Sequence, residues 1–350
     1  MNSPSVAVVI LNWNGKKFLE QFLASVVKSR YENLQIYVID NASTDDSVLY
    51  IGQNFPSVKI ICNEKNFGFA GGYNEGLKKV EADYIVLLNQ DVEVPENWIA
   101  PVIEMMEHDK TIAGAQPKIK MFADKNSFEY AGAAGGLMDK YFFPFCNGRV
   151  FDTLEKDEKQ FEKISEIFWA GGACIFVRKK LFDECGGFDA DLFAHMEEID
   201  LCWRLKNRGH KIMYCPSAEV FHVGGGSLDK SKPFKTYLNF RNNLIIITKN
   251  YYGNNFYSVF VMKRLLDAIA AWRFLFRGEF RHFFAVLKGH FHFYMTMQKT
   301  LKKRKQLKAE SVCSLNETGR INKSIVWQYY LRRRKKSQQI VSGIKTQVSR

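Results

Sequence analysis

The segment Val8-Val9-Ile10-Leu11-Asn12-Trp13-Asn14-Gly15 decides how this chain folds. Its first half belongs to an apolar, β-branched run over residues 6–11, which predicts a strand buried on both faces. Its second half turns polar and ends in glycine, and apolar residues at helical spacing follow. A doubly buried strand that leads into a helix is typical of a parallel sheet covered by helices.

This strand-and-helix unit repeats, so the sequence predicts an α/β fold with a mostly parallel central sheet, Rossmann-like in its N-terminal half. The further strands are expected at residues 34–39, 58–62, 84–88, 173–177, 211–214 and 219–223. The further helices are expected at residues 47–53, 95–107 (opened by Pro95), 178–184 and 196–207, and another follows the glycine-rich segment 68–72 and continues through residue 80. We expect one main domain over residues 1–250 and a basic helical extension over residues 251–350.

Polar residues follow each of the first four predicted strands. Because ligands of parallel sheets bind at the carboxyl ends of the strands, these residues are expected to meet at one site. They are Asn12-Trp13-Asn14, Asp40-Asn41, Asn63–Gly72 and Asn89-Gln90-Asp91.

Two of the strand ends carry candidate metal ligands. Asp91 follows a buried strand, where a carboxylate suits Mg²⁺ or Mn²⁺, although an Asp there is often only a turn residue. His222 precedes Gly224-Gly225-Gly226-Ser227, where glycines permit close backbone approach to a phosphate. A neutral imidazole is a further possible ligand for the same metal, and a structural histidine is the alternative.

Three carboxylates open the helix predicted at residues 196–207. Glu197 and Asp200 share one face of it, whereas Glu198 points elsewhere. All three also suit the positive end of the helix dipole, which is the purely structural interpretation. This division would let one carboxylate face a substrate while its neighbours support the structure, and a general base needs a carboxylate within hydrogen-bond reach of the hydroxyl that it deprotonates.

Eight segments together resemble family-2 glycosyltransferases of the bacterial cell-surface type, above all the rhamnosyltransferase-like branch. The resemblance covers residues 5–250 and implies the GT-A fold of nucleotide-diphospho-sugar transferases. The segments, in family order, are VVILNWNG (8–15), VIDNASTDDS (38–47), NFGFAGGYNEG (66–76), LLNQDVEV (87–94), WAGGACIFVRKKLF (169–182), GGFDADLF (186–193), EEIDLCWRLKNRG (197–209) and H-x-G-G-G-S (222–227).

The resemblance implies a nucleotide site on the N-terminal side. Asp40 would contact a pyrimidine base, with Asn12 and Asn41 shaping its pocket, and Asn66 and Gly68 would lie along the ribose. The family's acidic motif, which would bind the metal, is often Asp-x-Asp.

Asn89 occupies the first position of that motif, beside the nucleotide, so the number of protein ligands stays open. Asp91 would bind the metal and His222 would complete the metal and diphosphate site. Glu198 would be the general base, with Glu197 as its rival because many members carry Asp at the second position.

The remaining implied residues concern the acceptor and the leaving group. Trp169, Gly171 and Gly172 would border the acceptor, and Arg241 would approach the leaving diphosphate. The implied reaction is inverting, with dTDP-rhamnose as the favoured donor and UDP-hexoses next. The implied acceptor is a lipid-linked or cell-surface glycan. A non-catalytic nucleotide-sugar or membrane-binding module is the alternative, whereas a dinucleotide oxidoreductase is disfavoured because no G-x-G-x-x-G follows the first strand.

The charge of the chain is divided unevenly. Residues 251–350 hold 21 Lys and Arg against 4 Asp and Glu, a local charge of +17, whereas the whole chain carries +13 and the first 250 residues therefore −4. Helices rich in aromatic and basic residues, with basic runs at 302–305 and 332–336, favour an anionic membrane surface over a solvated helical cap. No RNA-binding motif accompanies them, so no nucleic-acid partner is expected.

The chain shows no signal peptide and no apolar run long enough to cross a bilayer. Its seven cysteines form no C-x-x-C pair, which favours buried free thiols in a reducing compartment. We therefore expect a cytoplasmic enzyme bound peripherally to the inner face of the cell membrane.

Overall fold

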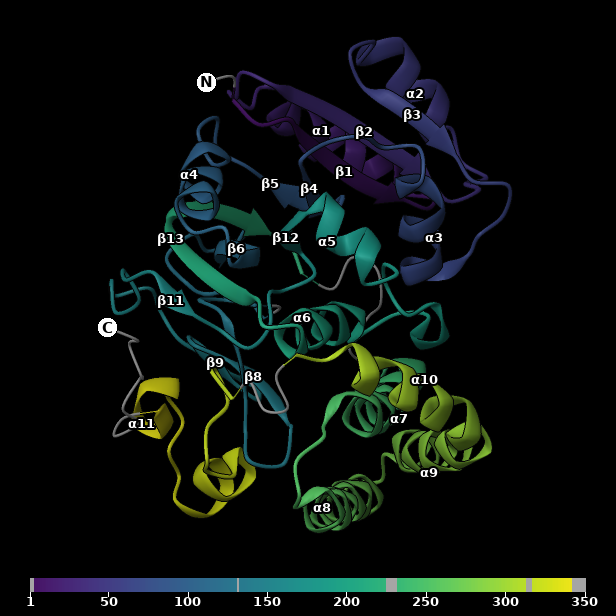
Figure 1. Ribbon diagram of the computed structural model, residues 1–350, viewed down its shortest axis with the longest axis vertical. Coiled ribbons are helices and arrows are strands. Elements are labelled where there is room, and N and C mark those ends of the chain that lie inside the picture. Colours follow the sequence, from purple (N-terminus) through teal and green to yellow (C-terminus); the bar gives the residue numbers. More distant parts are fainter. Residues whose placement is uncertain (1–2, 131, 225–231, 313–316, 342–350) are drawn as a thin grey trace.

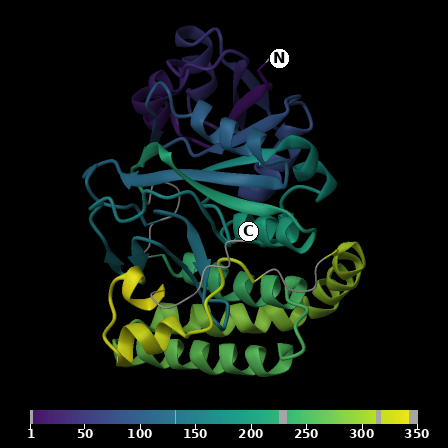
Figure 2. The ribbon, with the colours of Figure 1, turned by 60° about the vertical axis from the view of Figure 1, so that its left-hand side comes forward.

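The computed structural model describes residues 3–130, 132–224, 232–312 and 317–341. A twisted central sheet runs through the upper half of the molecule, and helices from the last hundred residues form a layer below it (Figure 1, Figure 2). The predicted α/β architecture with a mostly parallel sheet and a C-terminal helical region is confirmed.

The central sheet has nine strands, in the order β11-β13-β6-β12-β4-β1-β2-β3, with β5 paired to β13. Strands β3, β2, β1 and β4 are parallel to their neighbours, as are β6 and β13, whereas β12, β11 and β5 pair antiparallel. The strands are β1 (Val6–Asn12), β2 (Leu34–Asp40), β3 (Lys59–Cys62), β4 (Tyr84–Leu88), β5 (Val92–Glu93), β6 (Ile112–Met121), β11 (Ser165–Glu166), β12 (Cys174–Arg178) and β13 (Lys211–His222).

Alternate residues of β1 enter two different cores, because successive side chains of a strand point to opposite faces. Val8 and Ile10 pack with the helices α1, α2 and α4, whereas Ala7 and Val9 pack with α3, α5 and α6, whose bounds follow. The helices of the main domain are α1 (Lys16–Val27), α2 (Ser47–Asn54), α3 (Gly68–Leu77), α4 (Ala100–His108), α5 (Lys179–Glu184) and α6 (Glu197–Asn207), with a 3₁₀ turn at Ala190–Leu192.

Two predicted elements differ in the structure. Helix α4 begins at Ala100 rather than Pro95, because Pro101 is the proline that occupies the first turn, where its missing N–H costs nothing. The two short strands predicted after Lys211 form one strand, β13, whose register against β6 shifts between Cys215 and Glu219. An irregularity of this kind bends a strand without ending it.

A second sheet of four short strands lies between the main sheet and the chain's last described segment. Its order is β10-β9-β8-β7. Leu137, Phe145 and Val150 of this sheet pack against Ile325 and Tyr329. The elements concerned are β7 (Gly136–Met138), β8 (Pro144–Cys146), β9 (Arg149–Val150), β10 (Thr153–Leu154), a π-helical turn at Trp327–Leu331 and α11 (Ser337–Val341).

The C-terminal helices use part of the predicted basic surface for internal contacts. Lys303 pairs with Asp189 and Asp191, and Arg304 donates to the carbonyl oxygens of Thr248 and Tyr251. The basic run at 302–305 therefore fastens its helix to the main domain and is not a uniformly solvated stretch. These helices are α7 (Pro233–Asn250), α8 (Phe256–Phe276), α9 (Phe280–Met295) and α10 (Met297–Glu310).

A buried group of charges joins α6 to α7 and α10, and we call Asp189, Asp200, Arg204, Lys249 and Lys303 the Asp200 ion cluster. Asp200 is fully buried and lies 2.8 Å from Arg204 Nε and 2.7 Å from Lys249 Nζ. Lys249 and Lys303 both pair with Asp189. Burial alone would raise the pKa of Asp200, but Lys249 and Arg204 outweigh it, so the pKa is lowered.

None of the described helices is long and apolar enough to cross a membrane. The described cysteines are all free, and four of them are buried, as predicted. Cys62 is exposed and Cys185 partly so, which corrects the prediction for these two, while Cys313 lies outside the described residues.

We expect Lys249→Met to lower the free energy of unfolding by about 3–5 kcal/mol, because it leaves Asp189 and Asp200 buried without a shared counter-charge. Urea denaturation followed by circular dichroism measures this change. Lys180→Met is the matched control: its ammonium is exposed and 3.9 Å from Glu184, so the loss should stay below about 1 kcal/mol. Equal losses in the two variants would contradict the role given to the cluster.

Candidate active site

The ends of β1 and β2 bring Asn12 and Asp40 together, because the two residues are direct partners in the parallel ladder. Asn12 Nδ2 donates to Asp40 Oδ1 at 2.9 Å and to Ser43 Oγ at 3.1 Å. Asp40 Oδ2 accepts from the backbone N–H of Ser43 at 3.0 Å. Both side chains are buried, so the polar end of the first strand forms a fixed hydrogen-bonded floor.

Asn41 fastens the next segment of the chain to this floor. Its Nδ2 donates to Asn66 Oδ1 at 2.9 Å and to the carbonyl oxygen of Gly68 at 3.0 Å. Asn66 Oδ1 also accepts from the backbone N–H of Gly68 at 2.8 Å. Gly68 has φ +74°, and a Cβ there would meet the ring of Phe193 at 2.7 Å, so only glycine fits without strain.

The end of β4 lies against the same floor. The backbone N–H of Asn89 donates to the carbonyl oxygen of Ala173 at 3.0 Å, and the side chains of Gln90 and Asn12 crowd the Cα of Gly15. Within the described part of the chain, Asn12 Oδ1 and Gln90 Oε1 are buried without a hydrogen-bond partner. Two unsatisfied buried acceptors at strand ends are suited to a ligand that donates hydrogen bonds.

Asp91 and His222 are brought together by backbone pairing. His222 is the ladder partner of Val92, and the N–H of Val223 donates to the carbonyl oxygen of Asp91 at 3.0 Å. His222 Nε2 lies 3.1 Å from Asp91 Oδ1. Two residues 131 positions apart in the chain thus meet with a geometry that strands, and not loops, determine.

His222 has a second carboxylate partner, Glu129, whose Oε2 lies 3.2 Å from Nδ1. Burial alone would lower the pKa of His222, but its contacts with Asp91 and Glu129 outweigh burial and raise the pKa to about 10. Gly224 lets the chain pass close to Glu129, because a Cβ at this position would lie 2.7 Å from Glu129 Oε1. Its φ is also positive, a conformation that glycine adopts without strain. Glu129 belongs to no motif, so sequence reasoning did not find it.

The assignment of Asp91 and His222 as metal ligands stays a prediction. Across the described ranges, no group of three or more His, Cys, Asp or Glu side chains is arranged to hold a metal ion. Asp91 and His222 lie side by side, and they can hold a divalent ion that also takes oxygen ligands from a diphosphate once Nε2 of His222 gives up the proton that Asp91 and Glu129 stabilise. Gly225, Gly226 and Ser227, predicted to approach the phosphate, lie outside the described residues.

The helix that carries the predicted base begins at a constrained loop. Phe193, His195 and Met196 all have positive φ, an uncommon backbone conformation that persists only where surrounding contacts hold it. Asn242 of α7 supplies such contacts, because its Nδ2 donates to the carbonyl oxygens of Leu192, Ala194 and His195. The carbonyl oxygen of Phe193 accepts from the first turn of α3.

Glu197 and Glu198 differ in accessibility although they are neighbours. Glu197 is buried and the pKa of its carboxyl is raised well above the usual value, first by burial and then by the charge of Glu198. Glu198 is half-buried, and burial raises its pKa to about 7 against the opposing backbone hydrogen bonds of the helix start. Its carboxyl lies over Gly172, where a Cβ would be 3.7 Å from Glu198 Cδ.

The other predicted residues of the site lie as follows. Asp200 is occupied within the Asp200 ion cluster, so its side chain supports the helix. Trp169 is buried and its Nε1 donates to the carbonyl oxygen of Leu137 at 3.0 Å, whereas the N–H of Gly171 donates to Gln116 Oε1 at 2.8 Å. Gly172 is the one of the three acceptor residues that contacts Glu198.

Arg241 is bonded through its whole guanidinium group. Its Nη2 donates to the carbonyl oxygens of Asp191 and Leu192, both at 3.0 Å, and Nε and Nη1 donate to Asn242 and Tyr237. These bonds hold the 3₁₀ turn before α6. The predicted contact of Arg241 with a leaving diphosphate stays a prediction.

A parallel sheet that ends in a polar floor, with an Asp-His pair and a half-buried glutamate at its edge, defines a GT-A type nucleotide-diphospho-sugar transferase fold. Residues 7–186 match the sequence profile of glycosyl transferase family 2. The chain belongs to this family, as its motifs predicted.

Two relatives illustrate the range of the family. An N-acetylglucosaminyl-diphospho-decaprenol L-rhamnosyltransferase of Mycobacterium tuberculosis is 26% identical over 232 residues, which cover 61% of this chain and 75% of that protein. A poly-beta-1,6-N-acetyl-D-glucosamine synthase of Staphylococcus aureus is 22% identical over 222 residues, covering 61% of this chain and 48% of the relative.

Solved structures share the fold. A structure that contains UDP, GalNAc and Mn²⁺ aligns with a TM-score of 0.56 at 20% identity, over 70% of this chain and 48% of the other. A mannosyltransferase from Pyrobaculum calidifontis in complex with GDP-Man and Mn²⁺ aligns with a TM-score of 0.53 at 12% identity, over 91% and 88%. At these identities the likeness establishes the fold alone.

We expect Gly68→Ala to lower the free energy of unfolding by about 1–2 kcal/mol, because an L-residue at positive φ is strained and its methyl group meets Phe193. Urea denaturation measures the change. Gly52→Ala in α2 is the control, since a Cβ there meets nothing within 4 Å and should add about 0.5–1 kcal/mol of stability. A loss of stability in both variants, or in neither, would show that the backbone conformation at position 68 does not require glycine.

Proposed function

We propose that this chain transfers a sugar from a pyrimidine nucleotide diphosphate to a hydroxyl group of a lipid-linked or cell-surface glycan, with inversion at the anomeric carbon. Membership of the family supports glycosyl transfer itself. The observation that carries the proposal further is the Glu198 carboxylate, half-buried over Gly172 and with a pKa of about 7. A general base is most effective when its pKa lies near the working pH.

The donor nucleotide is proposed to lie along the polar floor at the ends of β1 and β2. Asp40 and Asn12 would contact the pyrimidine ring of the nucleotide. Asn66 and Gly68, which Asn41 holds in place, would lie along the ribose. The fixed hydrogen bonds among these residues support this assignment, because a preorganised polar site loses little entropy on binding. The rhamnosyltransferase relative favours dTDP-rhamnose as donor, with UDP-hexoses next.

Glu198 is proposed to accept the proton of the acceptor hydroxyl. The oxygen then attacks the anomeric carbon from the face opposite the phosphate, so that one carbon–oxygen bond forms while the bond to the diphosphate breaks. A single displacement of this kind inverts the configuration. Glu197 is the weaker candidate for the base, because it is buried and its pKa is raised well above that of Glu198.

Asp91 and His222 are the residues proposed to hold Mg²⁺ or Mn²⁺. A bound divalent ion supplies charge neutralisation for the departing nucleoside diphosphate. Glu129 would orient His222 through Nδ1 and leave Nε2 directed toward the metal position beside Asp91. Mn²⁺ in two structures of the same fold supports this choice of cofactor.

We place the reaction at the cytoplasmic face of the cell membrane. The relative from Mycobacterium tuberculosis is named for a decaprenol-linked acceptor, and lipid-linked substrates of that kind are confined to a bilayer. The charge of +17 in residues 251–350 supports attraction to anionic lipid headgroups. The division at residue 250 between a transferase domain and this extension stays a prediction.

We expect Glu198→Gln to reduce sugar transfer by about 10²–10⁴-fold, the usual contribution of a general base. Transfer by the wild type should fall as the pH drops below about 7, because protonation of Glu198 removes the base form. Radiolabelled donor turnover at a series of pH values measures both effects.

Glu197→Gln is the matched control, one residue away and of identical size, and should keep most of the transfer activity. A reversed pattern would assign the base to Glu197. Full transfer by Glu198→Gln would refute the assignment of Glu198 as the general base. If the wild type bound the donor but transferred no sugar, the alternative of a non-catalytic nucleotide-sugar-binding module would be favoured.

We expect dTDP-rhamnose with Mn²⁺ to raise the melting temperature more than UDP-hexoses do, and Asp91→Asn to abolish the part that depends on the metal. Isothermal titration of Mn²⁺ in the presence of dTDP measures metal affinity separately from catalysis. Glu129→Gln should weaken Mn²⁺ binding about 10–100-fold, as removal of an orienting partner does. The control is Asp124→Asn, which changes an exposed carboxylate in the same loop between β6 and β7. An equal loss of Mn²⁺ affinity in the two variants would exclude a specific role of Glu129.

A further inference from the structure

Helices α8 and α9 lie at an outer edge of the molecule (Figure 1, Figure 2), and many of their large apolar side chains are exposed to solvent. On α8 the exposed large side chains recur at helical spacing along one stripe, and α9 has a second stripe. We call the following set the α8–α9 outer face: Tyr257, Val261, Leu265, Ile269, Trp272 and Phe276 of α8, and Phe280, Phe284, Leu287, Phe291, Tyr294 and Met295 of α9.

The distribution of polarity on α8 is the reverse of that expected for a helix on a water-soluble surface. Phe276 is 83% exposed and Tyr257 80%, whereas Lys263 and Asp267 are buried as an ion pair on the opposite side. Asp267 also lies 3.3 Å from His290 of α9. Each exposed Phe or Trp has an unfavourable contact with water that only another apolar phase removes.

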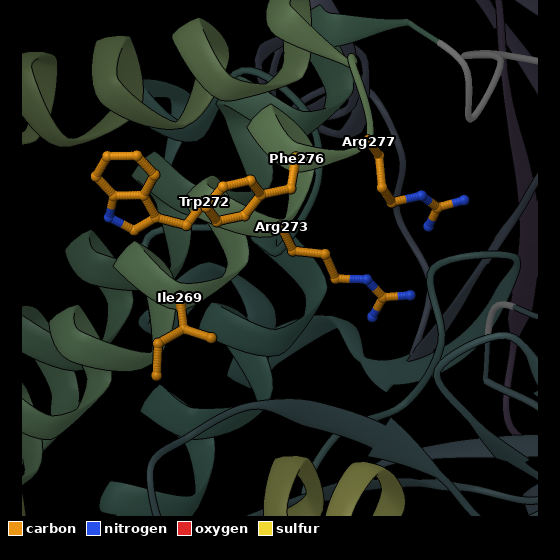
Figure 3. A pocket seen from close by; sticks show the side chains of 5 residues that line it. All are labelled: Ile269, Trp272, Arg273, Phe276 and Arg277. Carbon is orange, nitrogen blue, oxygen red and sulfur yellow. The ribbon is translucent and has the colours of Figure 1, made fainter.

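The two stripes lie on helices that pack against each other. The rings of Trp272 and Phe283 lie 6.2 Å apart across the two helices, and Arg264 stands over the ring of Tyr294. Ile269, Trp272 and Phe276 border an open hollow together with two arginines (Figure 3). In this view both rings point the same way, while the guanidinium groups of Arg273 and Arg277 point the opposite way.

The charge around this face is predominantly positive. Its exposed cations are Arg264, Arg273, Arg277, Arg281 and Lys288. The acidic residues of the sequence from 256 to 295 are Asp267, which is buried, and Glu279, which pairs with Arg277. Aromatic side chains flanked by cations match the boundary between acyl chains and anionic headgroups.

We infer that the α8–α9 outer face inserts its aromatic side chains into the interfacial region of an anionic lipid bilayer. Charge favours lipid over a second copy of this chain, because a two-fold contact would set the five exposed cations against the same five. The inference deepens the proposed function. Membrane binding itself is argued from the α8–α9 outer face, and only its biological role rests on the proposed function, because a lipid-linked acceptor would lie in the same membrane.

The same helices identify which part of the basic extension makes this contact. Lys303 and Arg304 are engaged with the main domain, and Lys335 stands over the ring of Tyr329. The exposed cations of α8 and α9 flank two stripes of exposed apolar side chains, whereas Leu301 is the exposed large apolar side chain of α10. The bilayer therefore meets the α8–α9 outer face, and the basic run at 302–305 is secondary.

Short, close contacts connect this face to the candidate active site. Gly289 of α9 packs on the backbone of α7, where a Cβ would lie 3.1 Å from the carbonyl oxygen of Tyr237. His292 bonds the hydroxyl group of Tyr237 at 2.8 Å. Helix α7 in turn holds the loop before Glu198 through Asn242. A docked enzyme would therefore hold Glu198 in a fixed orientation to the bilayer.

Vesicle sedimentation of the full chain tests the inference, with phosphatidylcholine vesicles that contain or lack phosphatidylglycerol. We expect binding to the anionic vesicles, and Trp272→Ser/Phe276→Ser should weaken it about tenfold or more through lost insertion. Arg277→Gln/Arg281→Gln should weaken binding and reduce its salt dependence. These side chains are exposed, so the circular dichroism melting curves should match that of the wild type.

Matched controls are Leu49→Ser/Ile164→Ser, exposed apolar residues outside the two helices, and Lys17→Gln/Lys28→Gln, exposed lysines of the main domain. Both should bind as the wild type does. Equal binding to neutral and anionic vesicles, release by Lys302→Gln/Lys305→Gln alone, or a concentration-dependent dimer abolished by Trp272→Ser/Phe276→Ser without vesicle binding would each overturn the inference. The donor-dependent thermal shift, measured without lipid, reports on the proposed function independently.

Discussion

The pairing of Asp200 with Lys249 and Arg204 is the constraint on which the catalytic side of the molecule depends. A carboxylate with no solvent exposure is tolerated only when its charge and hydrogen-bonding capacity are met, and residues of α6 and α7 meet those of Asp200. The cluster fixes α6, and with it Glu198, relative to α7 and α10. The C-terminal helices are therefore part of the site's framework, although none of them carries a predicted catalytic group.

Much of the fold follows from the sequence because it depends on local pattern. Apolar runs that end in polar residues predicted β1, β2 and β4, and the rule for parallel strand ends predicted that Asn12 and Asp40 would meet. The start of α4 was predicted wrongly, because Pro95 and Pro101 both satisfy the rule for a first-turn proline and only packing distinguishes them.

What the sequence did not reveal depends on distant contacts. Glu129 approaches His222 through tertiary structure, and no local pattern distinguishes it from an ordinary surface glutamate. Glu197 and Glu198 are the same type of residue, and their pKa values differ only through their surroundings, first of all burial. A count of charges treats Lys303 like Arg281, yet one is paired with Asp189 and the other is exposed. The sequence thus identified the chemical groups, whereas the structure assigned each one its surroundings.

The connection between Lys303 and Asp189 has a consequence for the order in which the protein is made. The two residues are 114 positions apart, so the ribosome must finish α10 before the turn that precedes α6 can be fastened. Until then Asp189 lacks one of its two lysine partners, and Asp191 lacks both Lys299 and Lys303. Because chains fold from the N-terminus as they emerge, the polar floor at the ends of β1 and β2 forms before the contact between α10 and Asp189. A chain cut short before α10 would therefore have its central sheet but would lack the ion pairs that Lys303 makes with Asp189 and Asp191.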